Sequence, residues 1–252
     1  MIALTGLLAT ATALVQTELT SATVLRTVAH RSAQPSPEVE AWRVRVQFDF
    51  AGGITGPVAD LSGRLTLFER TMGGGALIQM PRGDEWAVHF PNLCGDNKPQ
   101  DCPRAILESG PADFLNPGTN NFRWGASVQM LPNETSDGSN VLQKGLSMSG
   151  SQFKLQVDGS QGRPSCVLSS DEGKFVAFAS ESITDGRWHD LICDRTNSQL
   201  TLYVDGWPRA ETIVPAGLSI VNEMPLTLGG KGQGPYNDQF HGTLDNAFVA
   251  IA

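Results

Sequence analysis

Charged residues are scarce in this sequence. They make up 17% of its 252 residues, and no segment is rich in lysine and arginine. Long helices with charged outer faces need more of them, so a mainly helical framework is excluded. Acidic residues outnumber basic ones and give a formal net charge of −8. Nucleic acids and anionic membranes favour a basic patch on a protein partner. We therefore expect no nucleic acid as a partner and no membrane insertion of the folded part.

Signatures of catalysis are also missing. The sequence has no Gly-x-Ser-x-Gly elbow, and "GGKGQG" (229–234) lacks the spacing of a phosphate-binding loop. No histidine has a second histidine or cysteine at metal-binding spacing. For His189, a structural role beside Trp188 is favoured over catalysis. This predicts that His189→Ala lowers stability more than it changes the affinity for any ligand.

The N-terminus differs from the rest of the chain. "MIALTGLLATATALV" (1–15) is an uncharged run with the length of the apolar region of a signal peptide, but it has no basic residues before it. Gln16 and Glu18 end the run before the ~20 residues that a membrane span needs. "RSAQPSPEVE" (31–40) has the composition of a linker. We expect residues 1–41 to be a leader and linker, and residues 42–252 to be one folded domain. A loosely structured leader that is not a signal is the alternative.

Four cysteines allow three pairings, and the sequence alone does not choose among them. Their spacing favours two disulfides, Cys94–Cys102 across a short polar loop and Cys166–Cys193 between two strands. Zinc is the alternative, but neither pair has the two-to-four-residue spacing typical of structural zinc ligands. Disulfides persist in oxidising compartments, so they indicate a secreted or cell-surface protein.

From Trp42 onward the pattern is that of β-structure. "WRVRVQFDF" (42–50) alternates, with Val44, Val46 and Phe48 on one face. Similar short runs follow, separated by turns that supply the positive φ angles of tight hairpins. Four of these turns are Asp-Gly pairs, at 137–138, 158–159, 185–186 and 205–206. Many short strands at such intervals predict a two-sheet sandwich or a barrel.

Residues 188–206 read as a hairpin, because two alternating runs are joined by Asn197-Ser198. In the first run Trp188, Asp190 and Ile192 share one face, and His189, Leu191 and Cys193 share the other. The hairpin predicts that the Trp-His pair serves packing.

The segment "DGRWHDLICDRTNSQLTLYVDG" (185–206) resembles the signature of laminin-G-like domains, which have a concanavalin A-like jelly-roll fold. Three other segments resemble the family in the expected order. They are "VADLSGR" (58–64), "NVLQKG" (140–145) and "FHGTLDNAFV" (240–249). The resemblance implies an all-β, two-sheet antiparallel jelly-roll sandwich over residues 42–252. It says less about function, since this fold serves lectins, adhesion modules and glycosidases.

The resemblance also implies a structural Ca²⁺ ion. Many domains of this fold hold calcium with backbone carbonyls and one acidic residue of the last strand, and Asp245 is the position that matches. Asp49 and Asp60 are candidate helpers, because calcium prefers oxygen ligands. The alternative is that Asp245 hydrogen-bonds backbone at the end of a sheet.

A sugar site would combine an exposed aromatic ring with planar polar side chains, because the ring packs on the C–H face of a sugar while amides and carboxylates bind its hydroxyls. Trp207, in a turn, is one candidate, although packing at the rim is its alternative role. Tyr236, Asn237, Asp238 and Gln239, beside the glycine-rich stretch, are the others. The remaining tryptophans lie in strand-like runs and are expected in the core: Trp42, Trp86, Trp124 and Trp188.

Together these features predict a secreted or cell-surface, non-catalytic binding module for a glycan or for a cell-surface or matrix protein. The alternative is a polysaccharide-active hydrolase or lyase of the same fold with a divergent site. Jelly-roll glucanases usually present their carboxylates as Glu-x-Asp-x-x-Glu, and this sequence lacks that motif. A purely structural exported domain is a third interpretation.

Overall fold

The computed structural model describes residues 44–95, 99–148 and 150–252. The expected leader and linker (1–41) and Trp42 lie outside the described residues, so the boundary at residue 42 stays a prediction. In the part of the chain that the structure describes, no helix is long and apolar enough to cross a membrane.

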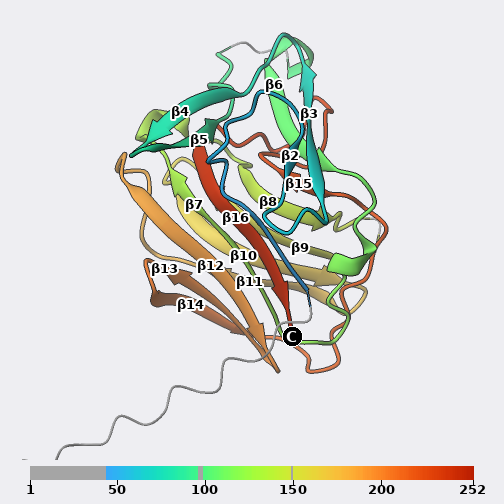
Figure 1. The fold of residues 1–252 in the computed structure, drawn as a ribbon. Helices are drawn as coiled ribbons and strands as arrows, with labels where there is room; N and C mark the ends of the chain where they lie inside the picture. Colours follow the sequence, from blue (N-terminus) through green and yellow to red (C-terminus); the bar gives the residue numbers. More distant parts are fainter. Residues whose placement is uncertain (1–43, 96–98, 149) are drawn as a thin grey trace, which may run out of the picture. The chain divides into compact units, whose positions relative to one another are not determined.

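Within the described residues, sixteen strands form two antiparallel sheets of eight strands each, which Figure 1 shows as a sandwich. Sheet A has the order β14-β13-β12-β7-β16-β5-β4, with β1 also paired to β16. Its strands are β1 (Val44–Phe48), β4 (Ile78–Arg82), β5 (Glu85–His89), β7 (Phe122–Gln129), β12 (Trp188–Thr196), β13 (Gln199–Val204), β14 (Trp207–Ile213) and β16 (Thr243–Ile251). The predicted all-β, two-sheet antiparallel sandwich is confirmed.

Sheet B has the order β11-β10-β9-β8-β15-β6-β3-β2. Its strands are β2 (Val58–Ala59), β3 (Thr66–Met72), β6 (Arg104–Ser109), β8 (Asn140–Gly145), β9 (Gln152–Asp158), β10 (Arg163–Ser170), β11 (Gly173–Phe178) and β15 (Leu226–Leu228). The described connections include three short 3₁₀ turns, Pro99–Asp101, Asp113–Leu115 and Pro132–Glu134.

The core lies between the inner faces of the two sheets. Alternation along each strand sends every second side chain inward, as Val46 and Phe48 of β1 show. Phe122 and Trp124 stack with ring centroids 4.6 Å apart, and the ring of Phe153 from sheet B lies 5.4 Å from both. These aromatic contacts join the two sheets at the centre of the sandwich.

Two of the tryptophans expected in the core lie elsewhere. Trp124 is fully buried, as predicted, but Trp86 is 41% exposed and Trp188 is half-buried. The register of β12 with β7 places Trp188 opposite Gln129, on the outer face of sheet A. The prediction was wrong for these two residues because alternation shows which residues share a face, but not which face is buried.

Both favoured disulfides are present. Cys94 is bonded to Cys102, and Cys166 of β10 is bonded to Cys193 of β12. The second bond connects sheet B to sheet A, and both of its cysteines are fully buried. No free cysteine remains among the described residues.

The hairpin expected at 188–206 is formed by β12 and β13, with Leu191 opposite Val204 and Thr196 opposite Gln199. Asn197 has a φ of 53° in the turn between them. The two Asp-Gly turns that flank the hairpin, at 185–186 and 205–206, meet at the ring of His189. The Trp-His pair therefore belongs to the architecture of the sheet.

A candidate binding groove on sheet A

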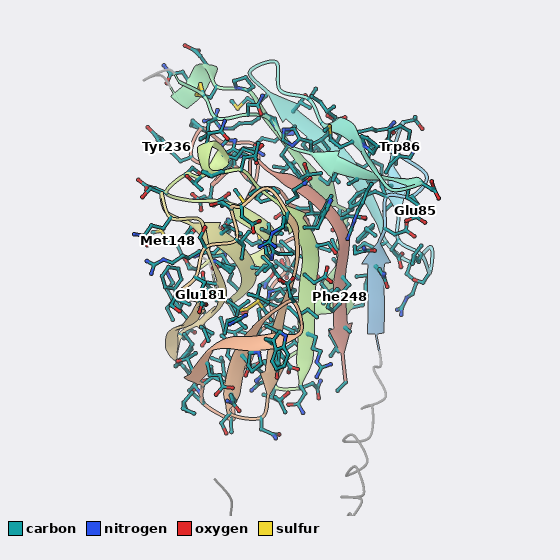
Figure 2. The ribbon with its side chains drawn as sticks, turned by 90° about the vertical axis from the view of Figure 1, so that its left-hand side faces the viewer. Glu85, Trp86, Met148, Glu181, Tyr236 and Phe248 are labelled. Atoms are coloured by element: carbon teal, nitrogen blue, oxygen red, sulfur yellow. A yellow bond between two sulfur atoms is a disulfide. The ribbon has the colours of Figure 1, made fainter. Side chains whose placement is uncertain are left out.

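A groove of about 440 Å³ lies on the outer face of sheet A, over the strands β1, β7, β12 and β16. In Figure 1 these strands run side by side, with β16 in red between β7 and β1. The groove is lined by polar and aromatic side chains and by aliphatic ones. The polar and aromatic residues are Gln47, Arg123, Ser127, Asp190, Asn246 and Phe248, and the aliphatic residues include Ile192 and Ala250. Figure 2 labels Phe248 on this side of the sandwich.

The floor of the groove is apolar. Gly125 of β7 pairs with Ile192 of β12 on one side and with Phe248 of β16 on the other, so the three residues form one row across the sheet. A Cβ atom at Gly125 would lie 2.9 Å from Cε1 of Phe248 and would clash with the carbonyl oxygen of Leu191. The missing side chain therefore leaves room for the phenyl ring to lie across β7.

Polar groups flank this floor on both sides. In the next row, the Ser127 hydroxyl donates to Oδ1 of Asp190 at 2.5 Å. On the opposite side, Nε of Arg123 donates to Oδ2 of Asp194 at 2.5 Å. Asp190 is exposed, whereas Asp194 is buried. The groove thus offers the carboxylate of Asp190 as an acceptor beside an apolar surface. Arg123, which also lines the groove, is paired with Asp194.

A bulge in β16 shapes this arrangement. The register with β7 shifts between Asp245 and Phe248, and Asn246 has a φ of 50°. The extra residue keeps Asp245 opposite Ser127 and Phe248 opposite Gly125, so both side chains lie on the outer face. Asparagine tolerates the left-handed conformation better than most residues, and such outliers often occur at functional sites.

An ion pair lies at one end of the groove. Nη1 of Arg82 donates to Oδ2 of Asp245 at 2.6 Å, and the guanidinium carbon of Arg82 lies 4.1 Å from the ring centre of Trp188. Burial raises the pKa of Asp245 above its ordinary value, although the hydrogen bond from Arg82 lowers it. The cation that neutralises this buried carboxylate is therefore a guanidinium.

The three carboxylates expected at a calcium ion do not form a cage for one. Both oxygens of Asp245 accept hydrogen bonds, from Arg82 and from the backbone of Asn246. Asp60 accepts hydrogen bonds from Ser62 and from the backbone of Leu65, which stabilises its own turn. Asp49 accepts one from the backbone of Ala51. No group of three metal-ligating side chains occurs within the described ranges. A structural calcium ion held by Asp245 and backbone carbonyls therefore stays a prediction.

None of the five residues predicted to bind a ligand lines the groove. Trp207 is 69% exposed at the start of the edge strand β14, and Tyr236 is 73% exposed. Figure 2 labels Tyr236 and Phe248 on opposite sides of the sandwich. Asp238 is half-buried and accepts a hydrogen bond from Lys231. Asn237 and Gln239 are buried, and their amide groups bond to other parts of the loop and to β6.

The groove residues were missed because no single segment contains them. The shared face of Asp190 and Ile192 was predicted, but its neighbours on β7 and β16 come from sequence positions more than 50 residues away. The sequence does contain one local signal of the groove. Gly125 and Ser127 are small residues at alternate positions of an otherwise regular strand, which leaves space on one face.

An antiparallel two-sheet sandwich with a groove on one outer face has the architecture of a lectin-type jelly roll. Residues 115–249 match the family model of the Concanavalin A-like lectin/glucanases superfamily (Laminin_G_3), and the chain belongs to this superfamily. The fold and family expected from the sequence are confirmed. No curated protein sequence matches the chain.

Solved structures with the same fold share little sequence with the chain. Domain 4 of AbnA, an extracellular GH43 arabinanase from Geobacillus stearothermophilus solved with arabinotriose, has a TM-score of 0.61 and 12% identity over 82% of this chain and 91% of that one. The binding domain of Paraclostridial Mosquitocidal Protein 1 has a TM-score of 0.58 and 14% identity over 81% of this chain. A structure of botulinum neurotoxin type C, concerned with its interaction with two ganglioside molecules, has a TM-score of 0.56 and 11% identity over 82%. The chain spans about half the length of the last two of these chains, 48% and 47%.

Proposed function

We propose that the protein is an exported, non-catalytic module that binds neutral glycans in the groove on sheet A. The observation behind this proposal is the row of Ile192, Gly125 and Phe248 beside the exposed carboxylate of Asp190. The C–H face of a sugar would pack on the Phe248 ring, while its hydroxyls would donate to Asp190. The amides of Gln47 and Asn246 line the same groove and add donors and acceptors.

The charges favour a neutral glycan over an acidic one. Arg123, the cation in the lining, is paired with Asp194, and Arg82 at the end of the groove is paired with Asp245. Asp190 adds a negative charge that would repel a carboxylate or sulfate group of a sugar. The formal net charge of −8 acts in the same direction.

The solved relatives support a binding role. The arabinanase domain was solved with an arabino-oligosaccharide, and the neurotoxin structure concerns gangliosides. Two disulfides fit export to the cell surface or the medium. A protein partner is the alternative ligand, since a related neurotoxin binding domain was solved with synaptotagmin II.

A hydrolase or lyase is the second candidate, because Asp190 and Asp245 lie in one row with Ser127 between them. Carboxylates on strands two apart stand about 10 Å from each other, near the upper limit for glycoside hydrolysis. The contacts of Asp245 argue against this role, because its two oxygens already accept hydrogen bonds from Arg82 and from the backbone of Asn246. If the protein hydrolyses a glycan and Asp190→Asn abolishes that activity, the hydrolase interpretation is favoured over the binding module.

A glycan array of neutral and acidic oligosaccharides, probed with calcium and with EDTA, tests the proposal. We expect neutral glycans to bind under both conditions, and Phe248→Ala to weaken them about tenfold. Phe68→Ala is the matched control, because it removes a 39% exposed phenylalanine from β3 in the other sheet. If no glycan binds under either condition, the proposal fails and a protein ligand remains.

A further inference from the structure

A second pocket, of about 210 Å³, lies away from the groove. It is bounded by the loop that follows the glycine-rich stretch, by the Cys94–Cys102 disulfide and by the start of β6. Its walls include Leu93, Pro103, Arg104, Pro235, Tyr236 and His241. Figure 2 labels Tyr236 on the side of the sandwich opposite Phe248, so the two sites are separate.

The loop that forms one wall is held in place by buried polar groups. Arg104 donates to Oδ1 of Asn237 at 3.2 Å and to the carbonyl oxygens of Cys102 and Pro235 at 3.0 and 2.5 Å. Gln239 binds β6 like a neighbouring strand, because its amide accepts from the backbone N–H of Ala105 and donates to the carbonyl of the same residue. A wall fixed in this way loses little conformational entropy when a ligand binds.

His241 lines the pocket, and one of its ring nitrogens has no hydrogen-bond partner among the described residues. Its side chain is buried, at 7% exposure, and its Nδ1 lies 2.6 Å from the carbonyl oxygen of Pro91. A carbonyl only accepts, so Nδ1 carries the proton and the neutral ring has its lone pair on Nε2. Burial lowers the pKa of His241 below its ordinary value, which keeps the ring neutral near pH 7. Nε2 has no hydrogen-bond partner among the described residues. It is also not completely enclosed by protein atoms.

The other walls suit a small ring. Tyr236 is 73% exposed at the mouth of the pocket, and Leu93 and the two prolines add apolar surface. A volume of about 210 Å³ is below the ~300–1,000 Å³ of sites for drug-sized ligands. Three nitrogens of Arg104 already donate within the protein, and Asp238 is nearby, so the pocket is not built for an anion.

We propose that this pocket is a second binding site, separate from the groove, for a single neutral ring with hydroxyl groups, such as the terminal sugar of a glycan. One hydroxyl of the ligand donates to Nε2 of His241, and a C–H face of the ring packs on Tyr236. This site goes beyond the groove proposed above and does not depend on it, because the two share no lining residue.

Titration of the protein with a panel of neutral methyl glycosides, followed by NMR chemical shifts, tests the site. We expect at least one glycoside to shift the signals of the loop at 235–241 and the Nε2 signal of His241. His241→Asn keeps an N–H group for the Pro91 carbonyl but removes Nε2 and has no acceptor at that position, so it should weaken binding about tenfold with the fold intact. Tyr236→Ala, an exposed change that leaves the core untouched, should weaken it similarly.

Phe248→Ala distinguishes the two sites. It should leave the shifts at the loop unchanged even where it abolishes binding to the groove. The proposal is overturned if no glycoside shifts the loop signals, or if the shifts survive both His241→Asn and Tyr236→Ala.

Discussion

Both ring nitrogens of His189 face carboxylates that belong to turns. Nδ1 lies 2.8 Å from Oδ2 of Asp205, and Nε2 lies 3.1 Å from Oδ1 of Asp185. The other oxygen of Asp205 accepts from the backbone N–H of Asp190 at 2.9 Å. The histidine thus connects the two Asp-Gly turns at one end of the β12–β13 hairpin, which supports the structural role predicted for it.

Replacing His189 with alanine should destabilise the fold by about 1–2 kcal/mol, because the ring loses at least one hydrogen bond to a charged carboxylate. The affinity for a glycan should change less than the stability. Urea unfolding and a binding titration on the same variant measure the two effects. Arg187→Ala is the control, because its 79% exposed side chain also contacts Asp185 and should affect stability much less. Binding lost at unchanged stability would instead make His189 a ligand residue.

Lys144 is a buried cation whose partners are all neutral. Its ammonium donates to Oδ1 of Asn116 at 2.9 Å and to the carbonyl and side-chain oxygens of Asn222 at 2.8 and 3.0 Å. Burial lowers its pKa from 10.5 to about 8, although the charge of Asp113 acts in the opposite direction. Keeping the Lys144 ammonium charged in the folded protein therefore lowers the free energy of unfolding.

This lysine should make the protein more stable as the pH rises from about 8 to about 10.5. In that window the unfolded chain binds the proton and the folded one does not, so the free energy of unfolding increases with pH. We expect a gain on the order of 1–3 kcal/mol, since a shift of one pKa unit corresponds to about 1.4 kcal/mol. Urea unfolding at several pH values, compared between the wild type and Lys144→Met, isolates the effect. An equal pH dependence in both proteins would contradict it.

At the scale of strands, sequence patterns predicted those elements whose signals are local. The β12–β13 hairpin was predicted because its turn and both alternating runs lie within 19 residues of sequence. The bulge at Asn246 was not, because it exists only relative to β7, more than 100 residues away in sequence. Trp86 was placed in the core because alternation alone does not show that one face of the β4–β5 hairpin is open to solvent.

Gly125 is the element-scale feature on which the groove depends. Gly125→Ala should destabilise the fold by about 1–3 kcal/mol through overpacking and displace the Phe248 ring from the floor. Thermal unfolding and a glycan titration measure these two effects. Gly217→Ala is the matched control, because a Cβ atom there meets nothing within 4 Å. If Gly125→Ala binds and unfolds like the wild type, the close packing at this row is not needed.

At the scale of the whole molecule, the resemblance in four separate segments predicted the sandwich, and the candidate sites needed the three-dimensional structure. The groove joins β1, β7, β12 and β16, which meet only after the sheet has formed. The second pocket is lined by the predicted Tyr236, Asn237, Asp238 and Gln239, but the Pro91 carbonyl that orients His241 lies 150 residues away. Predicting such contacts requires the pairing of distant strands, which residue patterns do not specify.

The Cys166–Cys193 disulfide should stabilise the molecule as a whole, because it is the covalent link between its two sheets. Closing a loop of 27 residues restricts the unfolded chain by about 3–4 kcal/mol in the chain-entropy model. Replacing both cysteines with alanine should lower the free energy of unfolding by about that amount, measured by urea unfolding. The matched variant removes Cys94 and Cys102, which close a loop of 8 residues, and should have a smaller effect, about 2–3 kcal/mol or less. Removing Cys94 and Cys102 should also weaken glycoside binding at the second pocket, because these two residues line it. Removing Cys166 and Cys193 should leave that binding intact. If the two double variants unfold at the same urea concentration, the link between the sheets has no special role in holding the sandwich together.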